Sequence, residues 1–233
     1  MYCLLVICDA AAEILPLKFP ARLPYMDMVT SLFCVILLLF TLLMAFNRRK
    51  FESVMRSLFS ARIRTQLQRE SKVFGEWFYM FAILFYFLVQ AMLLFLLAQY
   101  VFPESVAGIR PFPLYFLLLG VVMADFFIKL LLTLLMSYIF ECPEDRLNFN
   151  LTKFFVHTVN SVAVFPLLAA TVYMDFPYLL FLYIPVFLTT FIVMIFRTLT
   201  LNSDKIPPFL FFLYFCTFEI LPYLIVAKLL FTI

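Results

Sequence analysis

The chain has 233 residues, of which 66% are hydrophobic and 13% are charged, and its formal net charge is +3. A soluble domain of this size leaves much of its surface in water and cannot hide so much apolar surface. The composition therefore excludes a soluble globular protein and predicts a polytopic membrane protein.

Residues 1–25 begin with an apolar stretch that is too short to cross a membrane. Pro16, Pro20 and Pro24 break any long helix in this segment. Basic residues do not precede the apolar stretch, so it is not typical of a secretory signal. We therefore expect an N-terminal interfacial segment at 1–25, followed by a single transmembrane domain at 26–233.

The rest of the chain contains stretches of roughly 20 or more mostly apolar residues, the length that a spanning helix needs. They lack the alternation of polar and apolar residues that a membrane barrel requires. The sequence therefore predicts an all-α bundle of about six spans. The expected spans are 28–46, 74–101, 114–140, 154–173, 178–196 and 209–229. With 33 Phe and only 3 Gly, close crossings through small residues should not be the main packing device.

The connection between the first two spans, residues 47–72, is strongly basic. Its eight Lys and Arg against two Glu give a net charge of +6. Phe51, Val54, Met55, Leu58 and Phe59 recur at helical spacing, which predicts a basic amphipathic helix over 50–71. The basic residues that we single out are Arg48, Arg49, Lys50, Arg56, Arg62, Arg64 and Arg69.

This basic helix has two readings. It can lie on anionic lipid headgroups and fix the topology, or it can be a docking surface for an acidic partner. Nucleic acid is disfavoured, because no stacking aromatics or binding motif accompany the charges. Twelve Lys and Arg fall on this side of the predicted spans and four on the other, which places the connection in the cytoplasm and both termini on the opposite side.

Three ionisable residues fall well inside predicted spans. Asp125 and Lys129 are four residues apart in the third span, so they share one helix face and can pair. Glu219 lies in the sixth span, and His157 and Asn160 lie in the fourth span, nearer the cytoplasm. A charge at mid-membrane costs about 3 kcal/mol, so we expect this polar cluster to face the bundle.

The polar cluster allows three interpretations. It can be an internal clasp of ion pairs and hydrogen bonds that fixes the arrangement of the helices. It can be a path for protons or ions, or a contact with a partner protein. Pro166, Pro185 and Pro222 add expected helix kinks, and Pro222 cannot donate a hydrogen bond to the carbonyl of Phe218, beside Glu219.

Motifs that carry enzyme chemistry are missing from the sequence. One His excludes a histidine-rich metal site, and three scattered Gly form neither a nucleophile elbow nor a phosphate loop. The five Cys show no paired metal-ligand spacing. Glu141, Glu144 and Asp145, before the fourth span, are expected to be solvated loop acids. We therefore expect no enzyme activity, no cofactor and no metal.

Three stretches of the chain resemble a known family. They are "NRRKFESVMRSLFSARIRTQLQRE", "HTVNSVAVFPLL" and "FLYFCTFEILPYLIVAKLL". They resemble the family called domain of unknown function 4271, which consists of integral membrane proteins of Bacteroidota. The residues that carry the resemblance include Asn160, Pro166, Tyr214, Cys216, Glu219, Pro222 and Lys228. The resemblance implies a multi-pass protein of a bacterial inner membrane, so that both termini would be periplasmic, but it implies no reaction.

Two functions remain open at this point. The first is a non-enzymatic inner-membrane subunit or scaffold of a larger complex, in protein secretion or envelope biogenesis. Its partners would be the lipid bilayer with its anionic headgroups and other integral membrane proteins. The second is a small proton- or ion-coupled transporter that uses Asp125, Lys129 and Glu219.

Overall fold

The computed structural model describes residues 25–57, 76–101, 108–139, 143–174, 179, 182–189 and 192–193. These residues form helices and turns and contain no strand, which confirms the all-helical fold class. Each of the four long helices contains an apolar stretch long enough to cross a membrane. The four are α2 (Met26–Ser57), α4 (Glu76–Val101), α6 (Pro111–Ile139) and α7 (Pro143–Tyr173).

Several sequence predictions fall on residues outside this description. They are the interfacial segment 1–25 except its last residue, part of the fifth span and the whole sixth span with Glu219 and Pro222. Arg62, Arg64 and Arg69 of the basic connection also lie outside the described residues. Spans one to four of the prediction correspond to α2, α4, α6 and α7.

Local sequence explains where these helices begin. Proline is the first residue of both α6 and α7, where its missing N–H would have no partner in the helix and its fixed φ suits the first turn. Asp27 lies in the first turn of α2, where a carboxylate interacts favourably with the helix dipole.

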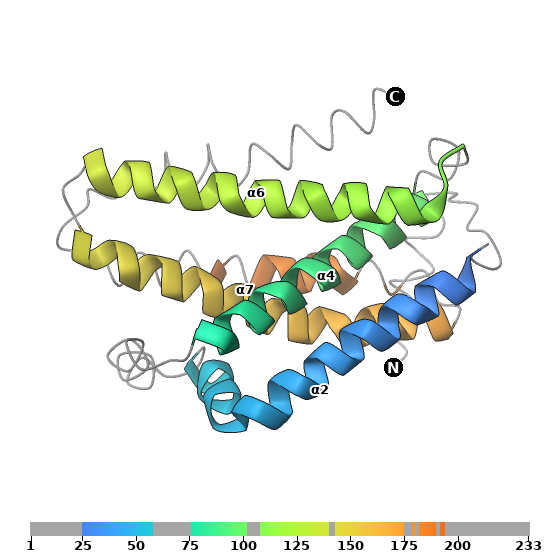
Figure 1. Ribbon diagram of the computed structural model, residues 1–233, viewed down its shortest axis with the longest axis horizontal. Helices are drawn as coiled ribbons and strands as arrows, with labels where there is room; N and C mark the ends of the chain where they lie inside the picture. The colour runs from blue at the N-terminus through green and yellow to red at the C-terminus, as the bar shows by residue number, and fades with distance from the viewer. Residues whose placement is uncertain are drawn as a thin grey trace.

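The other three long helices are arranged around α4, which packs against α2, α6 and α7 (Figure 1). Phe85, Met92 and Leu96 of α4 are fully buried in the main core. Phe33 and Phe40 of α2 reach the same core. Their rings and those of Phe85 and Phe165 form contacts with centroids 5.5 to 6.3 Å apart. Interlocking aromatic rings therefore join α2, α4 and α7.

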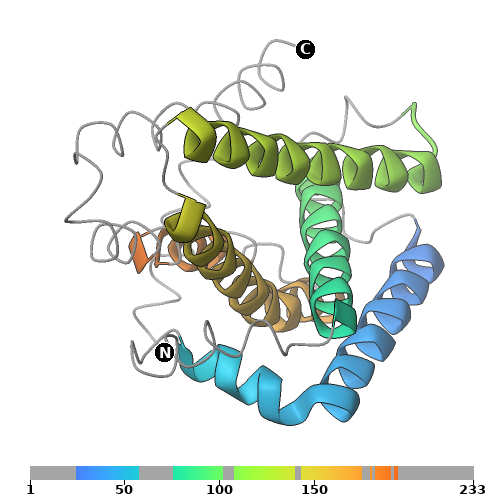
Figure 2. The same ribbon diagram turned by 60° about the vertical axis from the view of Figure 1, so that its left-hand side comes forward.

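The helix α2 bends between its apolar and its basic part. The rings of Phe40 and Phe51 are 5.9 Å apart, although eleven residues of straight helix rise about 16 Å. Figure 2 shows the change of direction, from the blue start of α2 to its cyan end. The bend folds the basic part of α2 back onto the bundle.

Two boundaries differ from the sequence prediction. Residues 47–49 were expected to separate the first span from the basic helix, but α2 continues through them to Ser57. Of the predicted loop acids, Glu144 and Asp145 instead lie in the first turn of α7, and Glu141 lies outside the described residues. A helix makes its backbone hydrogen bonds internally, so both helices can extend past their apolar stretches.

The predicted proline positions are only partly described. Pro166 lies inside α7, which continues on both sides of it, and its side chain is exposed. Pro185 is exposed in a short helical segment at 183–189.

Candidate functional site

An ion pair lies at the middle of α6. The Lys129 Nζ atom is 2.9 Å from the Asp125 Oδ2 atom, so the two residues form the pair that their spacing allows. Asp125 is fourteen residues from each end of α6. Both charges of the pair therefore belong to one helix, and the pair by itself does not tie two helices together.

The lysine reaches toward the centre of the helix rather than toward its nearer end. Side chains in a helix lean toward its N-terminus, and Asp125 is one turn in that direction from Lys129. The Lys129 side chain is 10% exposed and that of Asp125 is 28% exposed. The pair thus keeps the ammonium group inside the bundle instead of letting it extend to the membrane surface.

The pair lies where the buried face of α6 meets its exposed face. Tyr115, Val122 and Lys129 are buried on one side of the helix. Phe127 and Ile128 are exposed on the other side. Asp125 occupies the edge between the two faces, which explains why its carboxylate is only partly covered.

The polar residues of α7 are more deeply buried. Asn160 is 5% exposed, and within the described part of the chain its Oδ1 atom has no hydrogen-bond partner. The neighbouring hydroxyls of Thr158 and Ser161 donate to carbonyls of their own helix. A buried acceptor left without a donor costs about 1–3 kcal/mol, so the Asn160 oxygen is an available acceptor inside the bundle.

Aromatic rings connect the ion pair with His157. The half-buried His157 ring lies 4.9 Å from the Tyr86 ring of α4. Tyr86 in turn lies 6.2 Å from Phe126, the residue after Asp125. The predicted residues of α6 and α7 therefore lie at one level of the bundle, with Tyr86 between them.

Gln90 and Tyr183 are not among the site residues predicted from the sequence. The Tyr183 hydroxyl donates to the Gln90 Oε1 atom over 3.3 Å and joins α4 to the segment 182–189. Gln90 lies one turn beyond Tyr86 on the same face of α4. Like Asp125, Gln90 is a polar residue in the middle of an apolar stretch, and this pattern could have predicted a polar contact from the sequence.

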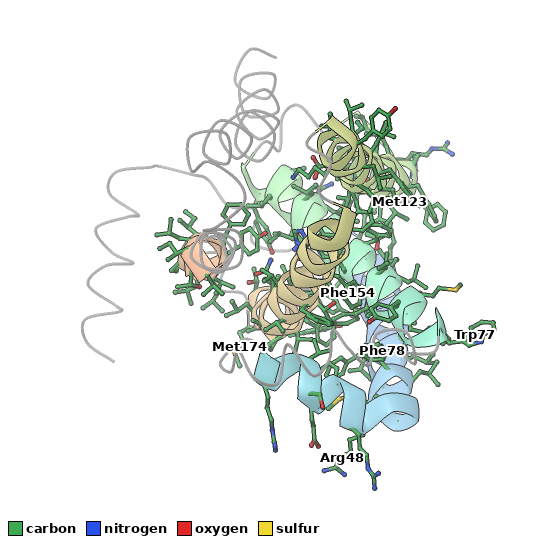
Figure 3. All side chains as sticks on the ribbon, turned by 90° about the vertical axis from the view of Figure 1, so that its left-hand side faces the viewer. Arg48, Trp77, Phe78, Met123, Phe154 and Met174 are labelled. Carbon is green, nitrogen blue, oxygen red and sulfur yellow. The ribbon has the colours of Figure 1, made fainter. Side chains whose placement is uncertain are left out.

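The second predicted site is the basic part of α2. We call residues 48–57 the basic arm. Arg48, Arg49 and Arg56 are exposed, and Arg48 pairs with Glu52 over 3.1 Å. Figure 3, seen from the end where α6 finishes, shows Arg48 pointing away from the bundle.

The apolar side of the basic arm packs on the bundle. Phe51 and Val54 are buried in a second core cluster with Phe78 of α4 and Phe154 of α7. Figure 3 shows Phe78 and Phe154 inside the bundle, whereas the neighbouring Trp77 points outward. The expected apolar stripe therefore exists over these residues, but its contacts are with protein.

Metal chemistry has little basis in these residues. Among the residues that the structure describes, no three His, Cys, Asp or Glu side chains gather where they could hold a metal ion. The arrangement can hold a paired charge and accept hydrogen bonds inside the membrane, and it can present fixed cations at one end of the bundle.

Comparison with known proteins gives a family and nothing closer. The family model described as domain of unknown function (DUF4271) matches residues 29–230. No curated protein and no solved structure matches the chain.

Proposed function

This chain belongs to the domain of unknown function 4271 family, and from that premise we propose that it is a non-enzymatic subunit or scaffold of a larger membrane complex. The complex lies in the cytoplasmic membrane of a member of the Bacteroidota. It serves protein secretion or the assembly of the cell envelope.

The basic arm is the observation that carries this proposal. A free amphipathic helix puts its apolar face into the lipid boundary. In this chain Phe51 and Val54, on the apolar face of the basic arm, pack with Phe78 and Phe154 instead of with lipid. The arginines are therefore held at a fixed position on the bundle, as a docking surface for an acidic partner requires, and nearby anionic headgroups contribute to the same attraction.

The expected topology is consistent with such a surface. The excess of Lys and Arg places the basic arm in the cytoplasm and both termini in the periplasm. Trp77 and Tyr138 are exposed at the same end of the bundle as the arm. Exposed Trp and Tyr are typical of residues at the membrane–water interface.

Co-purification tests the proposal. The tagged full chain is extracted in mild detergent, and co-purifying membrane proteins are quantified against an untagged control strain. We expect defined partners whose recovery falls severalfold in the variant R48Q/R49Q/R56Q. The control R110Q removes an exposed cation at the opposite end of the bundle and should leave recovery unchanged. A chain that always purifies alone would reject the proposal.

A second candidate function is a small proton- or ion-coupled transporter. The buried pair at the middle of α6 and the available Asn160 oxygen favour it. Flux across vesicles is measured for the wild type and for E219Q, D125N and K129M. A transporter requires a flux that these substitutions reduce, so absent flux, or flux that does not change, rejects this candidate.

A further inference from the structure

The basic arm is fixed at the depth where the apolar part of the bundle begins. Phe51 and Val54 of the arm belong to one buried cluster with Phe78 and Phe154. Phe78 is the second residue of the apolar stretch of α4, and Phe154 is the first residue of that of α7. Because the ends of the apolar stretches mark the edge of the hydrocarbon layer, the arm lies at the level of the lipid headgroups.

Arg48 and Trp77 extend sideways from the bundle at this end. The helix α6 runs along the long axis of the molecule in Figure 1, and Figure 3 is a view along that axis. In this view both side chains point outward from the bundle, and they are 80% and 70% exposed. Since a spanning helix crosses the membrane, side chains that extend across its direction reach the lipid around the bundle. An exposed Trp is typical of the headgroup level.

The arm also carries cationic donors that the described residues leave unused. Arg48 donates from Nε to the Glu52 Oε1 atom over 3.1 Å, which orients its guanidinium group and leaves the Nη donors for another acceptor. Arg49 and Arg56 are exposed and form no ion pair with any described residue. Four Lys and Arg against one Glu make the arm positively charged, and guanidinium groups bind phosphate through parallel hydrogen bonds.

We propose that the basic arm is a binding site for anionic phospholipid headgroups, in which Arg48, Arg49 and Arg56 hold the phosphate groups. This inference goes beyond the proposed function, because the site needs no second protein. The arm is already held in place by Phe51 and Val54, so it loses less conformational freedom on binding lipid than a free helix does. The choline cation of phosphatidylcholine cancels the charge of its phosphate, so the site prefers lipids with a net negative charge.

The test uses the full chain in vesicles that contain phosphatidylcholine and phosphatidylglycerol. The chain has one Trp, so W77F/A45W moves this reporter to an exposed position one turn before Arg48 and Arg49. Brominated acyl chains quench a nearby Trp, and quenching by brominated phosphatidylglycerol is compared with quenching by brominated phosphatidylcholine. We expect phosphatidylglycerol to be favoured about fivefold at the reporter, the preference that one cationic contact provides.

Variants of this reporter chain locate the effect on the arm. R48Q/R49Q/R56Q keeps the apolar contacts of the arm, so it should elute as the parent does, and its preference for phosphatidylglycerol should fall to about one. R110Q, at the opposite end of the bundle, should keep the preference, and high salt should weaken it. Equal association of the two lipids with the unsubstituted arm, or a preference that R48Q/R49Q/R56Q retains, would overturn the proposal.

The two proposals fail separately. Defined partners whose recovery depends on the arginines, without a preference for phosphatidylglycerol, would overturn the lipid site and assign the arm to an acidic protein alone. A preference for phosphatidylglycerol that depends on the arginines, in a chain that always purifies alone, would reject the proposed function and leave the lipid site.

Discussion

The helices α4 and α6 are both long and apolar, yet they occupy different positions in the bundle. Within the chain, 56% of the spanning stretch of α4 is buried, against 22% of that of α6. The apolar character of the two sequences therefore indicates that both helices enter a membrane, but it does not indicate which helix lies at the centre of the bundle. The helix α4 packs against α2, α6 and α7 and leaves only a narrower strip with Met80 and Leu84 exposed, whereas α6 buries one face and exposes the other.

The polar residues follow the same division. The centre of α4 contains an uncharged amide, Gln90, that bonds to Tyr183. The centre of α6 contains a charged pair at the edge of its buried face. A charge is tolerated at the periphery of the bundle because its counter-charge lies on the same helix, one turn away.

The largest expected effect is on the free energy of unfolding, and it should differ between variants of α4 and of α6. F85A in α4 removes a ring that is 0% exposed and should lower the free energy of unfolding by about 3–5 kcal/mol. F127A in α6 removes a ring that is 54% exposed and should change it by less than about 0.5 kcal/mol. Unfolding in mixed micelles with increasing denaturing detergent measures both. Equal losses would show that α4 is not the centre.

Breaking the ion pair from one side should be the next largest effect. D125L leaves the buried Lys129 without its carboxylate and should lower the free energy of unfolding by about 3 kcal/mol. The double variant D125L/K129M should restore most of this loss, since it removes both charges of the pair. The same unfolding assay tests the pair, and a double variant as unstable as D125L would contradict the unpaired Lys129 as the cause of the loss.

Replacing Asn160 should have a smaller effect of the opposite sign. N160L removes a buried acceptor that has no partner among the described residues and should stabilise the isolated chain by about 1 kcal/mol. S161A, which removes a hydroxyl bonded to its own helix, is the control and should be close to neutral. A destabilised N160L chain would indicate that a donor reaches the Asn160 oxygen.

The smallest expected effect concerns the amide of α4. Y183F removes the hydroxyl that donates to Gln90, and hydrogen bonds between membrane helices contribute about 0.6 kcal/mol on average. Q90L should give a similar loss, and the double variant Y183F/Q90L should lose no more than either single variant. Additive losses in this cycle would mean that the two side chains do not act as a pair.

Part of the candidate site could be predicted from sequence because it depends on local spacing. The four-residue interval between Asp125 and Lys129 fixes their pairing on any helix. The apolar spacing of Phe51 and Val54 likewise predicts a one-sided arm. The partner of that apolar side is not local, because Phe78 and Phe154 reach it only when three helices come together.

The sequence by itself determined that this protein is a membrane protein of apolar helices, with a charged pair inside one span and a basic arm beside another. Those properties follow from composition and from intervals of three and four residues along a helix. Tertiary structure decided that α4 is central, that α6 is peripheral and that the arm folds back on the bundle. Burial depends on which helices share a contact, and residues distant in the chain make that contact only after folding.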